Sequence, residues 1–260
     1  YLSFSFSPSP LGFYITQALL LIDAHTAMAT KACTYPLFLL ALLARSYAGV
    51  TAKLNCLSWR LAVETNNLQD WKQVPMECES YVADYMEHGQ YNDDTAFVAE
   101  TALIYARTIT NTTNAVWVFS VDQTALSNLP YYREHGYGTQ PYNQTAYSEW
   151  VMKGNAPPIR ETLSLYRRLR IRGFKIVFLA GRPIEQLDVT ASNLRRAGFT
   201  GWLKLILKGH EYDGKPDWKS AERKKLVEAG YRIVGNVNDH AITGDYVGDR
   251  TFKLPNPMHG

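Results

Sequence analysis

Polar residues that could carry acid–base chemistry follow directly on an apolar run near the middle of the chain. The run Ala115–Phe119 (AVWVF) predicts a buried strand, and Ser120–Thr124 (SVDQT) comes next. A carboxylate such as Asp122 can shuttle a proton, whereas a serine hydroxyl attacks only when a base or a metal activates it. No histidine lies close to Ser120 in the sequence. The stretch therefore offers an acid–base group and a hydroxyl, without a nearby activator for that hydroxyl.

The elements that must position these residues alternate between strand and helix from residue 115 onward. Expected strands cover 115–121, 174–179, 203–207, 231–237 and 251–254, with helices over 159–172, 184–197 and 218–229. Such alternation favours a parallel sheet with crossover helices, so we expect an α/β, three-layer Rossmann-like core over residues 115–260. Ligands of such sheets bind at the carboxyl ends of the strands. Ser120, Ala180 and Asn236 are expected there.

Two further segments complete the expected organisation. Residues 49–114 predict an N-terminal helical segment, including a helix from an Asp94 cap to Ala106 with Phe97, Leu103 and Ile104 on its apolar side. Residues 126–156 are rich in Tyr, Gly and Asn and are long for a plain connection, which predicts a flap or small cap near the site.

The chain from Cys56 to Pro257 resembles the plant acid phosphatases of class IIIB in the haloacid dehalogenase (HAD) superfamily, and their relatives the vegetative storage proteins. The loop after the first strand resembles the D-x-D-x-T motif of that superfamily, with Ser120 in place of the first Asp. Other stretches that carry the resemblance are Val118-Phe119, Leu126–Tyr132, His135–Gly138, Gly173–Ile176, Gly181-Arg182, Tyr231–Asn236 and Phe252–Pro257.

The resemblance implies a role for each residue that matches a motif. Ser120 stands at the position of the nucleophile, Asp122 at that of the proton shuttle, and Ala180 at that of a phosphate-binding Thr. Phosphate binding falls to Thr124, Gly181 and Lys219, with Lys219 also a catalytic position. The implied metal site uses the backbone carbonyl of Asp122 and the side chain of Asp239.

Three of the four motifs depart from the pattern of active relatives. Ser120 removes the carboxylate that forms the acyl phosphate and that also ligates Mg²⁺, and Ala180 removes a hydroxyl. Thr243 replaces the second acidic residue of the fourth motif, and Asp245 is displaced from that position by two residues. Only Asp239 remains as a side-chain ligand, so we expect Mg²⁺ to be the implied cofactor but to bind weakly.

The N-terminal region predicts entry into the secretory pathway. Met28, Lys31, the apolar run 36–44 and the small residues Ser46 and Ala48 follow the order of a signal peptide over residues 28–48. The apolar run is too short for a transmembrane anchor. Residues 1–27 are expected to be a non-structural leader. The mature protein is thus expected in the vacuole or outside the cell, without a membrane attachment.

Two cysteines and two sequons fit that route. Cys56 and Cys78 remain after removal of the signal peptide, and in an oxidising compartment they favour a disulfide over two buried free thiols. Asn111-Thr-Thr and Asn143-Gln-Thr are candidate N-glycosylation sites.

The charge pattern indicates no nucleic-acid partner. The formal net charge is +3, and the basic clusters on the predicted helices are interpreted as solvated faces. These clusters are Arg167, Arg168, Arg170, Arg172 and Arg223–Lys225. A homodimer is implied by the resemblance alone.

Three functions remain open on the sequence. The first is a non-catalytic or nearly inactive acid phosphatase relative, similar to vegetative storage proteins. The second is a weak Mg²⁺-dependent acid phosphatase that uses Asp122, Lys219 and Asp239. The third is a protein that binds phosphoryl ligands in the altered pocket. A phosphatase assay separates the second from the others, and a phosphate titration identifies the third.

Overall fold

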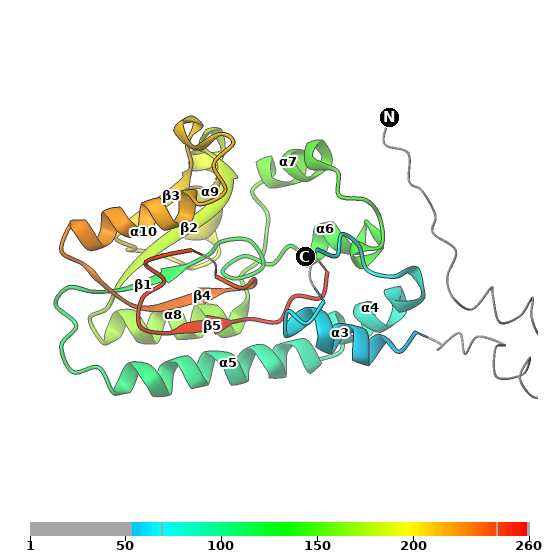
Figure 1. Cartoon of the computed structure of the whole chain (residues 1–260), viewed down its shortest axis with the longest axis horizontal. Coiled ribbons are helices and arrows are strands. Elements are labelled where there is room, and N and C mark those ends of the chain that lie inside the picture. Colours follow the sequence, from blue (N-terminus) through cyan, green and yellow to red (C-terminus); the bar gives the residue numbers. More distant parts are fainter. Residues whose placement is uncertain (1–53, 69, 243, 259–260) are drawn as a thin grey trace, which may run out of the picture. The chain divides into compact units, whose positions relative to one another are not determined.

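The computed structural model describes residues 54–68, 70–242 and 244–258, and its central element is a parallel five-stranded sheet (Figure 1). The strand order is β3-β2-β1-β4-β5, and every neighbouring pair is parallel. The expected α/β class and parallel sheet are confirmed. The bounds are β1 Ala115–Phe119, β2 Lys175–Pro183, β3 Lys204–Lys208, β4 Arg232–Asn238 and β5 Thr251–Lys253.

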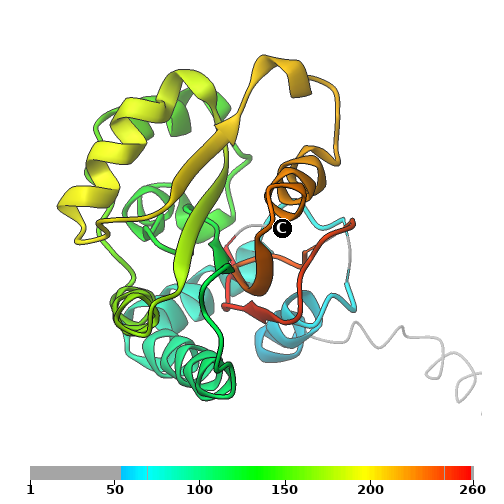
Figure 2. The same ribbon diagram turned by 90° about the vertical axis from the view of Figure 1, so that its left-hand side faces the viewer.

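Helices cover both faces of this sheet and form the outer two layers. Helices α5 (Gln90–Arg107), α8 (Arg160–Ile171) and α9 (Leu187–Arg196) pack on one face, and α10 (Trp218–Glu228) packs on the other. Figure 2 shows α5 and α8 on the opposite side of the strands from α10. Side chains of β1 alternate between the two cores: Trp117 and Phe119 face α5 and α8, whereas Val116 and Val118 face α10.

Glycine is required at one point in the β1–β4 pairing. A side chain at Gly235 would begin 2.5 Å from the ring of Trp117, which is fully buried and stacks on Phe252. The register between β1 and β4 also shifts between Val116 and Trp117. The bulky indole thus occupies the space that a Cβ on β4 would need.

The order of the strands places a switch point beside β1. The chain builds β1, β2 and β3 outward in one direction, then returns to place β4 on the other side of β1. Loops leaving the carboxyl ends of β1 and β4 therefore diverge, which opens a crevice between them. Ser120 follows β1 and Asp239 follows β4, so both lie at this crevice.

The N-terminal helices and the predicted flap share a second hydrophobic cluster. Helices α3 (Cys56–Glu64) and α4 (Glu79–Glu87) and the short η1 (Met76–Cys78) contribute Trp59, Cys78 and Val82 to it. The region predicted as a flap is itself folded, with α6 (Leu129–Arg133), η2 (Gly136–Gly138) and α7 (Gln144–Met152). A disulfide joins Cys56 of α3 to Cys78 of η1, which confirms the predicted bridge.

Two expectations about helix α5 were wrong in detail. Helix α5 begins at Gln90, after Gly89 at φ 106°, so Asp94 lies within the helix and pairs with Arg60 at 3.3 Å. Phe97 and Ile104 are 75% and 56% exposed, because the buried stripe of α5 runs through other residues: Tyr91, Thr95, Ala99, Ala102, Leu103 and Ala106.

The helix expected from residue 184 also begins later. Strand β2 continues to Pro183, and a 3₁₀ turn η3 (Ile184–Gln186) precedes α9. A second such turn, η4 (His210–Tyr212), follows β3. The predicted leader, the signal peptide and Thr243 lie outside the described residues.

Candidate functional site

A cavity of about 250 Å³ lies at the carboxyl ends of β1, β2 and β4. It brings together nearly all of the candidate residues, although they come from four separate parts of the chain. Those that line it are Ser120, Asp122, Ala180, Gly181, Lys219 and Asp239. Thr124 is fully buried beside them and contacts both Ser120 and Asp239.

The hydroxyl of Ser120 is bonded within its own loop. Ser120 continues the pairing of β1 with β4, since its backbone N–H donates to the carbonyl of Val237 at 3.0 Å. Its Oγ donates to Oγ1 of Thr124. A serine becomes a nucleophile when a base accepts its proton. Here the acceptor is another neutral hydroxyl, which gives no such activation.

The carboxylate of Asp122 is held by Arg182 and Tyr147. Both oxygens of Asp122 accept from Nε of Arg182, at 3.2 and 3.0 Å, and Oδ1 also accepts from the second guanidinium nitrogen at 2.7 Å. The hydroxyl of Tyr147, on α7 of the flap region, donates to the same Oδ1 at 2.7 Å. The carboxylate at the proton-shuttle position thus forms an ion pair with Arg182 and accepts a hydrogen bond from Tyr147 of the flap region.

This environment sets the pKa of Asp122. Burial alone would raise the pKa, but the charge of Arg182 and the hydrogen bonds from Arg182 and Tyr147 outweigh it and hold the pKa below the usual range. Arg182 is almost fully buried, with 3% of its side chain exposed, and its Nη1 also donates to Thr190 at 2.9 Å. The two charges therefore neutralise each other inside the protein.

Asp239 is the second carboxylate of the cavity, and its oxygens also have partners. Oδ2 accepts from the Asn256 side-chain amide at 2.9 Å and lies 3.1 Å from Nε2 of His240. Oδ1 accepts a longer bond of 3.4 Å from Thr124. Asn256 is itself positioned by α3, because its backbone N–H donates to Glu64 at 2.8 Å.

Lys219 is the cation that faces the cavity from α10. Burial lowers the pKa of its ammonium, and the charges of Asp239 and Asp122 partly oppose that effect. Among the described residues, no hydrogen bond joins this ammonium to a protein atom. One turn further along α10, Arg223 is 3% exposed and donates to the backbone carbonyl of Asp245. The interpretation of Arg223 as part of a solvated face was therefore wrong.

The oxygens of the cavity fit Mg²⁺ poorly. Mg²⁺ prefers octahedral oxygen coordination that includes one or two carboxylates. Asp122 uses its carboxylate on Arg182, so Asp239 is the one acid side chain left, and each of its oxygens already accepts a hydrogen bond. Over the described part of the chain, no three Asp, Glu, His or Cys side chains cluster as metal ligands would.

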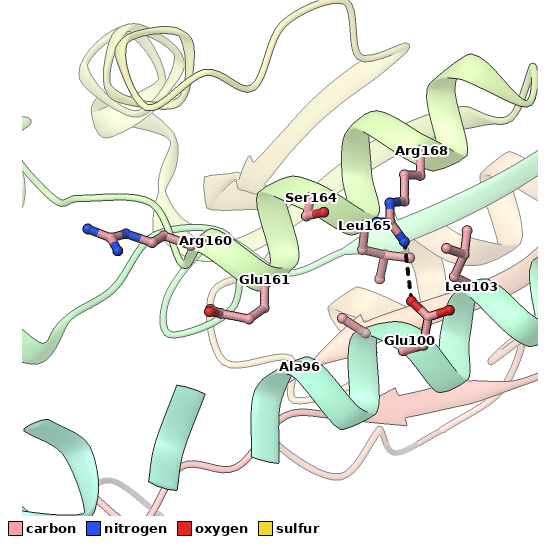
Figure 3. Close-up of a pocket in the computed structure, with 9 residues that line it drawn as sticks. Ala96, Glu100, Leu103, Arg160, Glu161, Ser164, Leu165 and Arg168 are labelled. Atoms are coloured by element: carbon pink, nitrogen blue, oxygen red, sulfur yellow. Dashed lines mark hydrogen bonds and ion pairs between the residues drawn. The ribbon is translucent and has the colours of Figure 1, made fainter. Parts of the chain in front are cut away.

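A second cavity, of about 240 Å³, lies between α5 and α8 and contains none of the motif residues (Figure 3). Figure 3 shows Glu100 of α5 directed at Arg168 of α8, and the two form a 3.2 Å ion pair. Its charged side chains are largely exposed, and its floor is formed by helix residues such as Ala99 and Leu165. We regard it as a groove between two packed helices.

The two sequons lie in different segments, one before β1 and one at the start of α7. Asn111 accepts from the backbone N–H of Thr113 at 3.1 Å, and Asn143 caps α7 by accepting from Ala146 at 3.0 Å. Both asparagines are exposed. Within the described residues, the structure contains no helix that is both long and apolar enough to cross a bilayer.

Several residues of the site were not assigned by the sequence. Arg182 follows Gly181 in a recognised motif, yet its pairing with Asp122 could not be read from a separation of 60 positions. Tyr147 comes from the flap region, where spacing gives no signal. Asn256 lies in the quoted C-terminal stretch and His240 follows Asp239, but neither had been given a contact.

The parallel sheet and the crevice beside β1 define the HAD class of fold, and comparison with known proteins agrees. Residues 44–260 match the family described as HAD superfamily, subfamily IIIB (Acid phosphatase). The chain belongs to this family. The class C acid phosphatase from Bacillus anthracis has a similar structure, with a TM-score of 0.59 and 20% identity over 71% of this chain and 86% of that one. At that identity the likeness concerns the fold alone.

Relatives from plants are closer in sequence. The chain is 44% identical to the stem 28 kDa glycoprotein of Glycine max, over 82% of this chain and 86% of the relative. It is 42% identical to acid phosphatase 1 of Solanum lycopersicum, over 80% and 84%. It is 41% identical to vegetative storage protein 2 of Arabidopsis thaliana, over 79% and 80%. The relatives thus include storage proteins and an acid phosphatase.

Proposed function

We propose that this chain is a non-catalytic member of the acid phosphatase subfamily, of the vegetative storage type. The observation that carries the proposal is Ser120, which stands at the nucleophile position of the resemblance and donates its hydroxyl to Thr124. An aspartate there forms an acyl phosphate that water can cleave. A phosphorylated serine would be a far more stable ester, and among the described residues no base accepts a hydrogen bond from Ser120 to start the reaction.

The state of Asp122 supports the same proposal. A general acid must reach the leaving group and release its proton near the working pH. Asp122 instead binds Arg182 with both oxygens, and its pKa is lowered. A carboxylate in this state holds the loop and the flap region together, and it is a poor proton donor.

The proposed role of Mg²⁺ follows from the donor set. Active members of the family are expected to use the metal to neutralise the phosphoryl oxygens. With Asp239 as the one available carboxylate, we expect weak Mg²⁺ binding here, and we assign no step to the metal.

The test is an Mg²⁺-dependent phosphatase assay on purified mature protein, with p-nitrophenyl phosphate at acid pH. The tomato protein named acid phosphatase 1 serves as the active control. We expect turnover at least a thousandfold below a typical enzyme value of about 10 s⁻¹. Turnover within tenfold of that value, lost in the Asp122→Asn variant, would establish the weak phosphatase alternative instead.

The storage role and the location rest on the names of the relatives, together with the predicted signal peptide. A storage protein accumulates when nitrogen is abundant and is degraded when it is scarce. Quantitative immunoblots of vacuolar and extracellular fractions, under both nitrogen supplies, test the role and the compartment together. A constant amount under both supplies would contradict storage.

A further inference from the structure

The charged residues of the chain are unevenly distributed. Residues 160–208 contain 11 arginines and lysines and 3 aspartates and glutamates, whereas residues 54–159 contain 5 and 12. The basic segment forms α8, β2, α9 and β3, which lie together at the β3 end of the sheet (Figure 2). The small net charge of +3 thus conceals a strongly basic region.

Two exposed arginines of this region lie on the loop 198–203, which joins α9 to β3. Nη1 of Arg170, on α8, donates to the carbonyl of Thr200 at 2.5 Å. The guanidinium of Arg195, on α9, lies over the ring of Trp202, with 5.3 Å between Cζ and the ring centroid. A guanidinium carries several N–H donors, so both groups retain donors for a further partner.

A third arginine reaches the same loop. Arg167, which is also exposed, lies one turn before Arg170 on α8. A Cβ at Gly198 would be 2.9 Å from Nη2 of Arg167, so the glycine leaves room for the guanidinium. Over the ranges that the structure describes, no acidic side chain forms an ion pair with Arg167, Arg170 or Arg195. We call these three residues, together with the loop 198–203, the arginine surface.

The fold explains the position of these arginines only in part. Cations are favourable in the last turn of a helix, which accounts for Arg170 on α8 and Arg195 on α9. The helix dipoles do not account for the lack of acidic partners, because the neighbouring Arg168 does pair, with Glu100 at 3.2 Å. Three like charges on one loop repel one another. An anionic ligand would offset that repulsion.

We propose that the arginine surface binds an acidic polysaccharide through the carboxylates of its uronate units. A guanidinium and a carboxylate pair through two parallel hydrogen bonds, a geometry that lysine lacks. Eight of the 11 basic residues in 160–208 are arginines. A polymer fits better than a single small anion, because exposed positive charges continue beyond the three arginines at Arg172 and Lys204.

Other polyanions fit the surface less well. Nucleic-acid bases stack on open aromatic rings, and here Arg195 covers one face of the ring of Trp202. The expected secretory route also leads the mature chain away from nucleic acid. A lipid surface takes up an apolar helix face. Within α8 and the loop, both of which the structure describes in full, the exposed large apolar residues are Ile171 and Leu203 alone.

The arginine surface is separate from the cavity of the candidate site. The loop precedes β3, so it lies at the amino end of that strand, whereas the cavity lies at the carboxyl ends of β1, β2 and β4. Polysaccharide binding therefore goes beyond the proposed function, and it depends neither on that function nor on Mg²⁺.

The first experiment compares a charged polymer with its neutral form. Thermophoresis measures the Kd of the mature protein for polygalacturonate at neutral pH, and separately for the same polymer after full methyl esterification. We expect the acid form to bind at least about tenfold more tightly, and its Kd to rise when NaCl is raised from about 0.05 to 0.5 M. Equal affinities for the two forms would overturn the proposal. Tighter binding to duplex DNA, or to vesicles of phosphatidylserine and phosphatidylcholine, at the same ionic strength would also overturn it.

Variants assign the binding to the three arginines. Arg167→Gln, Arg170→Gln and Arg195→Gln together should weaken polygalacturonate binding about tenfold or more, because three guanidinium–carboxylate pairs are lost. Replacing the same three residues by Lys keeps the charges but loses the paired donors, so binding should weaken about threefold. Circular dichroism confirms that both variants are folded. Parent affinity in either folded variant would contradict the proposed pairing.

A matched control separates this pairing from a general effect of charge. Lys72→Gln, Lys153→Gln and Lys215→Gln together remove the same charge from exposed positions outside the basic segment. This variant should change the Kd for polygalacturonate by less than about threefold, because charges beyond a Debye length are screened. A loss equal to that of the arginine-to-glutamine variant would overturn the assignment to the arginine surface.

Discussion

At the scale of single residues, the pair of Arg182 and Asp122 joins a buried guanidinium to a carboxylate that lines the cavity. The guanidinium is nearly inaccessible, and its partners include Asp122 and Thr190. Removing one member of a buried ion pair leaves the other charge uncompensated. Asp122 is therefore expected to matter for stability whether or not the protein turns over a substrate.

Asp122→Asn should lower the free energy of unfolding by about 3 kcal/mol, because the buried Arg182 loses its counter-charge. Urea denaturation at neutral pH measures the change. Asp213→Asn is the matched control, since Asp213 is 72% exposed beside His210, and it should change stability by less than about 0.5 kcal/mol. Adding Arg182→Gln to Asp122→Asn should recover part of the loss. Strict additivity of the two substitutions would contradict the pairing.

Ser120→Asp should raise phosphatase activity but leave it well below that of an active relative. The change restores the attacking carboxylate and a metal ligand, while Ala180 still lacks the phosphate-binding hydroxyl. Because both groups act on the same phosphoryl oxygens, Ala180→Thr and Thr243→Asp should add more to Ser120→Asp than to the parent protein. The measurement is kcat/KM for the single, double and triple variants with and without Mg²⁺. Full activity from Ser120→Asp alone would mean that the other departures are harmless.

At the scale of elements, helix α10 packs on the sheet through apolar contacts and is joined to the turn η4 by polar ones. Glu222 is 5% exposed, accepts from Tyr212 at 2.6 Å and pairs with Lys225 at 2.6 Å. Burial would raise the pKa of Glu222, but the bonds from Lys225 and Tyr212 outweigh it and lower the pKa. The same helix carries Lys219 into the cavity, so this contact helps to set where the ammonium lies.

Glu222→Gln should reduce stability by about 1–2 kcal/mol at neutral pH, because a charge-assisted bond is lost. Since the pKa of Glu222 is lowered on folding, its contribution is complete above the unfolded pKa of about 4.3 and is lost as the pH falls below it. Unfolding free energies of parent and variant should therefore converge as the pH falls below about 4. Glu228→Gln, 61% exposed on the same helix, should have little effect at any pH. A constant difference between parent and Glu222→Gln across that range would contradict the assignment.

The disulfide fixes the N-terminal helices beside the flap region. Replacing both Cys56 and Cys78 by Ala should lower stability by roughly 3 kcal/mol, since the cysteines are 22 positions apart and the open chain gains entropy when unfolded. Peptide mapping without reduction should recover the linked pair. Two alkylatable thiols in the native protein would refute the bridge.

At the scale of the whole molecule, the sequence located the site because the carboxyl ends of parallel strands share one edge. Ser120 and Ala180 could each be placed from the end of an apolar run, whereas Asp239 was assigned from the resemblance. The pairing of Asp122 with Arg182 could not be predicted, because it depends on how the loop after β1 folds toward the end of β2. Likewise, the helical spacing did not indicate that Arg223 is buried. Its burial results from the packing of α10 on the sheet.

The mature N-terminus is expected near Gly49, because the charged, apolar and small-residue segments end at Ala48. Terminal sequencing of protein isolated from its native tissue checks this. Sequencing should give a start within a few residues of Gly49. A native protein that retains Tyr1 would contradict both the cleavage site and the secretory route.

The ion pair at Asp122 also affects which substitutions the chain can accept without losing stability. A single substitution of Asp122 leaves the buried guanidinium of Arg182 without its counter-charge, so that step is penalised. A single substitution of Arg182 leaves the carboxylate of Asp122, whose side chain is 28% exposed, with its hydrogen bond from Tyr147. Ser120 carries no such constraint, because over the part of the chain that the structure describes its hydroxyl bonds only to that of Thr124. The first position of the motif, Ser120, can thus change at little cost in stability, while Asp122 is retained because the fold depends on it. Under the proposed non-catalytic function, a retained motif aspartate such as Asp122 serves the fold, and the number of matching motif residues is a poor measure of the chemistry of the site.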